Sequence, residues 1–404
     1  AFSGCSTDTE PSAKTIAYLI DRIREKQIQA VCAFLFLGVL ILSCGVNLMH
    51  KDRQMSEKEM RMLAQKPEIS LSGIASGRFM EQYEEYVSDQ FAGRDTWVRI
   101  KTFADSVAGR TKEGGVFKGK DHYLMEDVAV ADESDLKENL DAMKNFKERY
   151  PDIQMHMMLV PNAANIESDK LPGYAVTENQ EKQFKAIHST LGSVYTWVDV
   201  SDILKKHRSE EIYYHTDHHW TTLGAYYGYQ ALSKSMKLDT SKTSDMKPYA
   251  VTNAFNGTLA STSGYETGYE EPIYIYAPDN LKNATEAVVN NVNEKKKTAT
   301  LYDTSKLKGK DKYALFLGGN YPILDIKTTA DSTDRLLIIK DSYANSLIPF
   351  LIPYYREIVV VDPRYYYDDI EKVMKKDNIT SVLFLYNGNT FVKDNSISGV
   401  LQND

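Results

Sequence analysis

Apolar and polar positions follow two different periods along this chain, and the alternation of the two periods predicts an α/β fold. Over 133–150 apolar residues recur at every third or fourth position, which is typical of a helix with one buried face. The segment 78–107 predicts two short amphipathic helices that are separated near Gly93. Short apolar runs predict strands at 153–160, 194–200, 211–214, 335–340, 357–362 and 381–386. Because these strands alternate with helical or loop sequence, we expect a parallel sheet covered by helices on both faces.

The segment at about 239–330 has a different composition, rich in Thr, Ser, Asn, Lys and Tyr. We predict that it is a β-rich insertion in which EPIYIYAP, TATLYD and KYALFLGG form strands and NEKKK forms a hairpin-like turn. Many of the 27 tyrosines lie here. They are either ordinary core and surface residues or part of a carbohydrate-binding surface.

The segment 28–49 is a continuous apolar stretch without a charged residue. At about 1.5 Å per residue it is long enough to cross a hydrocarbon core of roughly 30 Å. We predict an N-terminal tail at 1–27, a transmembrane anchor at 28–50 and a single large domain at 51–404. The alternatives are a buried core helix and a removed signal sequence, although no A-x-A-like cleavage site follows. Basic residues lie on both sides of the stretch, so their distribution does not decide its orientation.

Charge and cysteine content narrow the class of protein. The net charge is −8, so no basic surface for nucleic acid is expected. Cys5, Cys32 and Cys44 precede or lie within the apolar stretch, and the domain after it has no cysteine. The domain therefore has no disulfide framework, which fits a cytosolic domain or an exported domain of a bacterium that does not rely on disulfides.

Two segments place reactive side chains where a predicted strand ends. In EIYYHTDHHWTTLG the strand leads to Asp217 and His219, and in RLLIIKDSYANS it leads to Ser342. Reactive groups of open α/β sheets collect at the carboxyl ends of strands. A serine nucleophile needs an imidazole that takes its proton and a carboxylate that fixes the imidazole tautomer. The alternatives are that Ser342 is only a helix N-cap and that HTDHH holds metal ions, as in manganese phosphoesterases, which need further aspartates.

The sequences of these two segments resemble the motifs of a known group of enzymes. DHHWTTLGAYY is similar to the Asp-x-x-His block of SGNH-type hydrolases, and KDSYANS to their Gly-Asp-Ser block, with Lys340 in place of the glycine. The order is reversed, because the Asp/His block comes first. This circularly permuted arrangement resembles the DHHW protein family and the AlgX/AlgJ-like proteins of alginate O-acetylation. Further similar stretches are SDQFAGRDTW (88–97), VPNAANIESDKLP (160–172) and VDPRYY (361–366).

The resemblance implies an SGNH-hydrolase-like catalytic domain that moves an acyl group, usually acetyl, onto hydroxyls of a cell-surface polysaccharide. It implies that Ser342 is the nucleophile, His219 the general acid and base, and Asp217 the residue that orients His219. His218 is expected to face away, and Trp220 to pack under the loop. No metal or organic cofactor is implied.

The resemblance also implies further residues and partners. Asn387, which ends the last strand, is the candidate oxyanion donor beside the backbone N–H of Ser342. Arg364 and Tyr365 are candidates for substrate binding, with a structural role as the alternative. A separate multi-span membrane acyltransferase is implied as the acyl donor, and the large domain is expected on the extracytoplasmic side of the membrane. The alternative functions are a carbohydrate esterase with the same triad and a non-catalytic polysaccharide-binding module.

Overall fold

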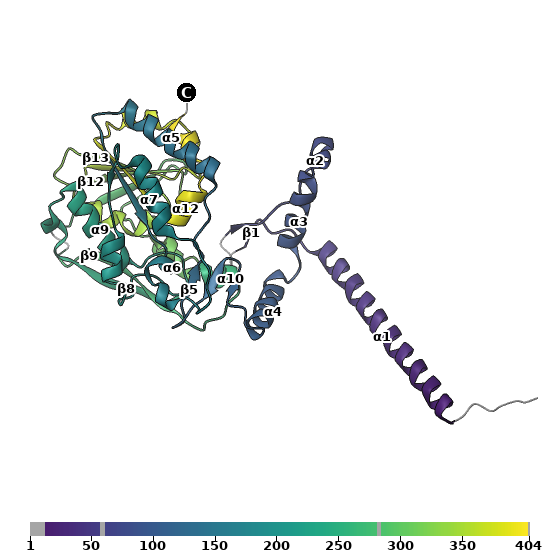
Figure 1. Ribbon diagram of the computed structural model, residues 1–404. Helices are drawn as coiled ribbons and strands as arrows, with labels where there is room; N and C mark the ends of the chain where they lie inside the picture. The colour runs from purple at the N-terminus through teal and green to yellow at the C-terminus, as the bar shows by residue number, and fades with distance from the viewer. Residues whose placement is uncertain (1–12, 57–60, 281–283, 403–404) are drawn as a thin grey trace, which may run out of the picture. The chain divides into compact units, whose positions relative to one another are not determined.

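A computed structural model describes residues 13–56, 61–280 and 284–402 (Figure 1). The described chain forms two compact units, one with residues 13–56 and 61–97 and the other from residue 98 onward. Residues 1–12 of the N-terminal tail that we predict at 1–27 lie outside the described residues.

The first unit begins with the long helix α1 (Ala13–Met49). Its stretch Arg24–Met49 is the one helical segment among the described residues that is long and apolar enough to cross a membrane, and none of that stretch is buried. This apolar helix fits a single-pass anchor or a signal sequence. The rest of the unit consists of β1 (Met55–Ser56), β2 (Arg61–Met62), α2 (Leu71–Ala75), α3 (Arg78–Gln90) and the start of α4 (Arg94–Val107). The break between α3 and α4 falls at Gly93, which has a positive φ of 71°, so the predicted pair of helices is confirmed.

The second unit is built on an eight-stranded sheet with the order β11-β10-β12-β14-β13-β15-β6-β7. The strands are β6 (Gln154–Val160), β7 (Thr196–Trp197), β10 (Ala287–Asn291), β11 (Lys296–Thr298), β12 (Ile323–Thr328), β13 (Arg335–Lys340), β14 (Glu357–Val361) and β15 (Ser381–Asn387). Neighbouring strands from β14 to β7 are parallel, whereas β12, β10 and β11 are added antiparallel. The sheet is therefore mixed, with the predicted parallel strands at its centre.

Helices cover both faces of this sheet (Figure 1). They are α5 (Glu133–Arg149), α6 (Ala163–Ile166), α7 (Gln180–Leu191), α8 (Ser201–Lys206), α9 (Thr222–Met236), α11 (Ile370–Lys376), α12 (Gly388–Lys393) and α13 (Ile397–Leu401). Short 3-10 helices are η1 (Ser168–Lys170), η2 (Thr240–Thr243), η4 (Thr304–Lys308), η5 (Tyr313–Leu315), η6 (Ser342–Ser346) and η7 (Ile348–Leu351). Small sheets are formed by β3 (Lys112–Glu113), β4 (Val116–Lys118) and β5 (Leu124–Glu126), and by β8 (Met246–Phe255) with β9 (Glu271–Pro278).

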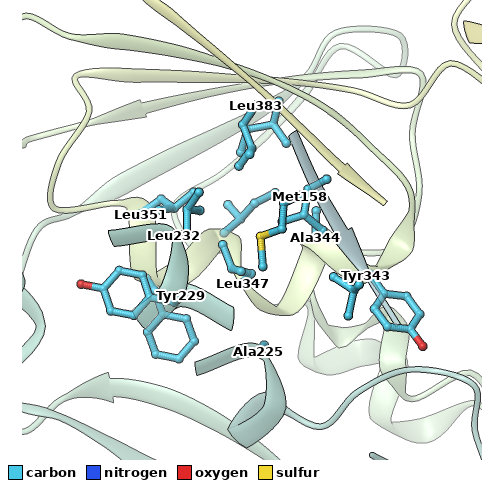
Figure 2. Close-up of a cluster of buried hydrophobic side chains, with 14 of the residues drawn as sticks. Met158, Ala225, Tyr229, Leu232, Tyr343, Ala344, Leu347, Leu351 and Leu383 are labelled. Atoms are coloured by element: carbon cyan, nitrogen blue, oxygen red, sulfur yellow. The ribbon is translucent and has the colours of Figure 1, made fainter. Parts of the chain in front are cut away.

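Strand β13 shows why the central strands of the sheet have uninterrupted apolar sequences. Leu336 and Ile338 face one core, with α9, η6 and η7, while Leu337 and Ile339 face the other, with α5, α7 and α12. Successive side chains of a strand point to opposite faces, so a strand covered on both sides needs apolar residues at every position. Figure 2 shows part of the first core, in which residues of α9 lie with Leu347 and Leu383.

Some predicted strands are wrong. Residues 211–214 form no strand, and only an isolated bridge joins Tyr213 to Trp220. Their apolar side chains are buried because the loop itself packs into the core. TATLYD and KYALFLGG likewise share a single bridge, between Tyr302 and Phe316, and η5 occupies part of the second segment.

The β-rich segment divides between two structures. β8 and β9 pair with each other, and α10 (Thr258–Ser263) lies between them in sequence. β10, β11 and β12 instead extend the main sheet. The first three residues of NEKKK lie in the turn from β10 to β11, and its last two lysines begin β11.

Candidate active site

Ser342 lies at the carboxyl end of β13, in the middle of the main sheet. It is the first residue of η6, and the N-cap of this helix is Asp341. One carboxylate oxygen of Asp341 accepts from the N–H of Tyr343 (2.9 Å) and the other from the N–H of Asn387 (2.9 Å). Asp341 is fully buried, and burial raises its pKa. The turn that carries Ser342 is thus tied to the end of the neighbouring strand β15, while Ser342 itself stays partly exposed.

His219 and Asp217 lie in the loop that leads into α9. Thr221 caps α9 by accepting from the N–H of Gly224 (3.2 Å). A side chain at Gly224 would lie 2.3 Å from the carbonyl oxygen of Ile212, so the loop closes only because this position is a glycine. Trp220 is fully buried and donates from Nε1 to the carbonyl of Tyr343 (3.0 Å), so it packs under the loop and joins it to η6.

The structure brings Ser342, His219 and Asp217 together in a chain of two short hydrogen bonds. His219 Nε2 lies 2.7 Å from Ser342 Oγ, and His219 Nδ1 lies 2.6 Å from Asp217 Oδ1. Because a carboxylate only accepts, Nδ1 carries the proton and Nε2 is left to accept from the serine hydroxyl. This is the arrangement in which an imidazole can remove the proton of a serine that attacks a carbonyl.

A family model described as "DHHW protein" matches residues 151–361, more than half of the chain and a range that includes all three of these residues. The chain belongs to the DHHW protein family.

Two solved structures with TM-scores above 0.5 show the same fold at low sequence identity. A DHHW family protein from Eubacterium siraeum is 24% identical with a TM-score of 0.58, and the likeness covers 72% of this chain and 96% of that one. PatB1 of Bacillus cereus, solved with a sulfonyl adduct, is 20% identical with a TM-score of 0.58, over 70% of this chain and 99% of that one. The O-acetyltransferase domain of AlgJ from Pseudomonas putida reaches a TM-score of 0.45 at 14% identity, over 70% of this chain and 94% of that one. No curated protein matches the sequence.

The second oxygen of Asp217 is held by the start of α10. The N–H and the hydroxyl of Thr258 donate to Asp217 Oδ2 at 2.8 and 2.9 Å. Gly257 allows this approach, because a Cβ there would lie 2.3 Å from the Cβ of Asp217. Burial by itself would raise the pKa of Asp217, but His218, His219 and the bond from Thr258 outweigh it and lower that pKa below its usual range. The carboxylate therefore stays charged.

Tyr313 and Glu271 are two supporting residues that the sequence did not reveal. The ring of Tyr313 stacks on that of His219, with centroids 3.7 Å apart and planes 11° apart, and its hydroxyl donates to the carbonyl of Ser342 (3.2 Å). Glu271 of β9 is buried and accepts from the N–H groups of His215 and Thr216, at 2.8 and 2.9 Å, and from the Thr216 hydroxyl at 2.8 Å. Both residues come from the β-rich segment, and no local motif marks them.

His218 forms a hydrogen bond with Thr258 and not with Ser342. Its Nδ1 lies 2.7 Å from the hydroxyl of Thr258, and burial together with the neighbouring His219 lowers its pKa. One ligand atom from each of Asp217, His218 and His219 lies within 4.8 Å of the others, which is close enough for a metal ion. A metal would have to replace the hydrogen bonds that these atoms make with Thr258 and with one another.

The Asn387 side chain, predicted as the oxyanion donor, takes part in other hydrogen bonds. The Asn387 side chain accepts from the N–H of Asn389 (2.9 Å) and donates to the carbonyl of Val160 (3.3 Å), so it caps α12. Its role as oxyanion donor stays a prediction. Its backbone N–H donates to Asp341.

Arg364 is bound to the buried Asp362 through Nε (2.8 Å) and Nη2 (2.7 Å). Lys340, which stands where the hydrolases have glycine, is also buried and donates to Asn320 Oδ1 (2.8 Å). Tyr365 is 46% exposed, beside the guanidinium of Arg364. Substrate binding by Arg364 and Tyr365 stays a prediction.

Proposed function

We propose that this protein is a membrane-anchored O-acyltransferase that moves an acetyl group, through an acyl-Ser342 intermediate, onto hydroxyls of a cell-surface polysaccharide. The observation that carries the proposal is the hydrogen-bonded chain from Ser342 Oγ through His219 to Asp217, at 2.7 and 2.6 Å. Its membership in the DHHW family and the sulfonyl adduct of the similar protein PatB1 support the proposal, because sulfonyl reagents form adducts with activated nucleophiles.

In the first half-reaction Ser342 Oγ attacks the acyl carbonyl while His219 Nε2 takes its proton. Asp217 accepts the hydrogen bond from His219 Nδ1–H and stabilises the imidazolium that forms. Nε2 then gives the proton to the leaving group, and the acyl group remains on Ser342. In the second half-reaction Nε2 removes the proton of a sugar hydroxyl, whose oxygen attacks the ester, and Ser342 regains the proton as it leaves.

The negative charge on the tetrahedral intermediate needs hydrogen-bond donors. The backbone N–H of Ser342 has no acceptor among the described residues and lies on the attacking residue itself. Asn387 is the second candidate, although its side chain would have to leave the bonds that cap α12. Each such donor contributes about 3–4 kcal/mol of transition-state stabilisation.

We propose that the apolar stretch of α1 lies in the membrane as an anchor at 28–50. The catalytic domain at 51–404 then lies on the extracytoplasmic side. A single apolar helix offers no path for an acyl group across the bilayer. We therefore propose a separate multi-span membrane acyltransferase as the partner that supplies it. The runner-up is a carbohydrate esterase, in which water instead of a sugar hydroxyl removes the acyl group from Ser342.

The test uses the full chain in detergent micelles with p-nitrophenyl acetate and, separately, with phenylmethanesulfonyl fluoride. We expect release of the chromophore and a single acetyl or sulfonyl adduct in the intact mass. Both should disappear in Ser342→Ala, and chromophore release should fall by roughly 10³-fold or more in His219→Asn. The matched control is His218→Asn, the neighbouring histidine, which should keep most of the activity.

The outcomes separate the alternatives. Equal inactivity of wild type and Ser342→Ala would contradict the acyl-serine mechanism and favour a binding module. Activity that survives Ser342→Ala but is abolished by a chelator would favour the metal site at Asp217, His218 and His219. Adding oligosaccharides then decides between transfer to sugar and hydrolysis.

A further inference from the structure

A hollow of about 660 Å³ opens beside the strands that flank Ser342. It is lined by Pro363, Arg364, Tyr366 and Tyr367, which follow β14, and by residues of α12 and α13, which follow β15. In the main sheet β14 and β15 are the two neighbours of β13, which carries Ser342. Arg364 lines the hollow and donates to Asp362, and the same carboxylate lies 3.4 Å from Nζ of Lys340, two residues before Ser342. The hollow therefore lies beside the end of β13, the strand that leads to the proposed nucleophile.

Hydrogen bonds within the chain hold two side chains of this hollow, Arg364 and Tyr367. Arg364 is held by its two bonds to Asp362, and Nη1 takes no part in them. Tyr367 is 84% exposed, and its hydroxyl donates to the carbonyl of Arg364 (3.1 Å), which restricts where the ring can point. A preformed polar and aromatic wall loses little conformational entropy when a ligand binds.

The chemistry of the lining selects an uncharged polyol. The cations are Arg364, Lys393 and the buried Lys340, and the acidic groups are Asp362, which pairs with both Arg364 and Lys340, Asp394, which lines the hollow, and the buried Asp341, which acts on Arg364. Such a balance gives no net attraction for an anion. Donors and acceptors side by side with a tyrosine ring suit a sugar, which presents hydroxyls at its edge and C–H groups on its face.

We propose that this hollow binds a neutral sugar unit of the acceptor polysaccharide, next to the unit whose hydroxyl receives the acyl group from Ser342. This assignment rests on the proposed function for its biological meaning. The binding of the sugar does not need the acyl group, so the two proposals can be tested apart.

Gly399 supplies a variant that closes the hollow without touching its polar groups. It lies on α13 and lines the hollow, and a Cβ at this position meets nothing within 4 Å. Gly399→Trp should therefore fill the space with an indole ring, whereas Gly399→Ala is the matched control that leaves it open. Tyr367→Ala removes the exposed ring.

The binding test uses the full chain with Ser342→Ala, in micelles, and three tetrasaccharides: chitotetraose, cellotetraose and tetragalacturonate. Saturation-transfer NMR and calorimetry measure binding. We expect a neutral tetrasaccharide to bind, and Gly399→Trp and Tyr367→Ala to weaken it at least about tenfold, which is 1.4 kcal/mol, with no change for Gly399→Ala. Binding of neither neutral sugar, binding of tetragalacturonate alone, or binding unaffected by Gly399→Trp would each overturn the assignment.

A second measurement keeps the two proposals distinguishable. With Ser342 present, Gly399→Trp should form the acetyl adduct from p-nitrophenyl acetate at the wild-type rate but transfer acetyl to the tetrasaccharide poorly. Loss of adduct formation in wild type with intact sugar binding would refute the proposed function and leave the sugar site standing. Normal transfer by Gly399→Trp would refute the sugar site and leave the acyl-serine mechanism standing.

Discussion

Gly257→Ala tests whether the exact position of Asp217 matters, without changing any of the three residues of the proposed triad. A Cβ at residue 257 would lie 2.4 Å from Asp217 Oδ2 and 2.3 Å from Asp217 Cβ, which is below any observed contact of this kind. Gly257 has φ −89° and ψ −164°, a conformation that alanine adopts freely, so the strain acts on the carboxylate and not on the backbone.

The expected magnitude follows from this geometry. Relief of the contact requires a shift of about 1 Å, and a displacement of that size in a catalytic group costs about 10²-fold in rate. The bonds from Thr258 to Asp217 Oδ2, at 2.8 and 2.9 Å, would lengthen at the same time. Complete loss of the support for His219 would lower the rate by about 10⁴-fold. We therefore expect kcat/KM to fall by a factor between these limits, and the free energy of unfolding to fall by roughly 1–3 kcal/mol.

The assay is p-nitrophenyl acetate turnover with urea unfolding on the same samples. Gly309→Ala is the matched control, since its Cβ would meet its nearest neighbour, a backbone oxygen, at an ordinary 3.5 Å. In a double-mutant cycle Gly257→Ala should add little to Asp217→Asn, because both act through His219. A folded Gly257→Ala variant with wild-type kcat/KM, or full additivity in the cycle, would refute the reasoning.

Two further variants test other parts of the structure. Glu271→Gln exchanges an acceptor-only group for an amide whose NH₂ must face the N–H donor of either His215 or Thr216. We therefore expect roughly 2–4 kcal/mol less stability and a lower kcat with little change in KM. Unchanged urea unfolding would contradict this. Glu167 is 1% exposed, and burial raises its pKa from 4.5 to about 7 against the opposing effect of Lys170. The folded protein therefore favours the protonated carboxyl, whose contribution to stability is full below about pH 4.5 and lost above about pH 7. Glu167→Gln should therefore gain stability relative to wild type as pH rises through this window, by up to about 3 kcal/mol at pH 8, and a difference independent of pH would count against the buried carboxylate.

The sequence by itself identified the central strands and the residues of the proposed triad. β6, β13, β14 and β15 were predictable because each is buried on both faces, which leaves an unbroken apolar run. Asp217, His219 and Ser342 were recognisable because short motifs hold them at strand or loop ends. The same rule failed at 211–214, where buried tyrosines belong to a loop packed into the core, since burial and strand formation leave the same apolar signature.

Only the tertiary structure decided what holds the site together. Gly257 and Thr258 position Asp217, Glu271 clamps the loop before it, and Tyr313 stacks on His219, yet all of them lie in the β-rich segment, far from these partners in sequence. Tertiary structure likewise decided that β10, β11 and β12 extend the main sheet antiparallel. Local periodicity reports which face of an element is buried, whereas the identity of the neighbour depends on how distant segments fold against each other, and no local pattern encodes that choice.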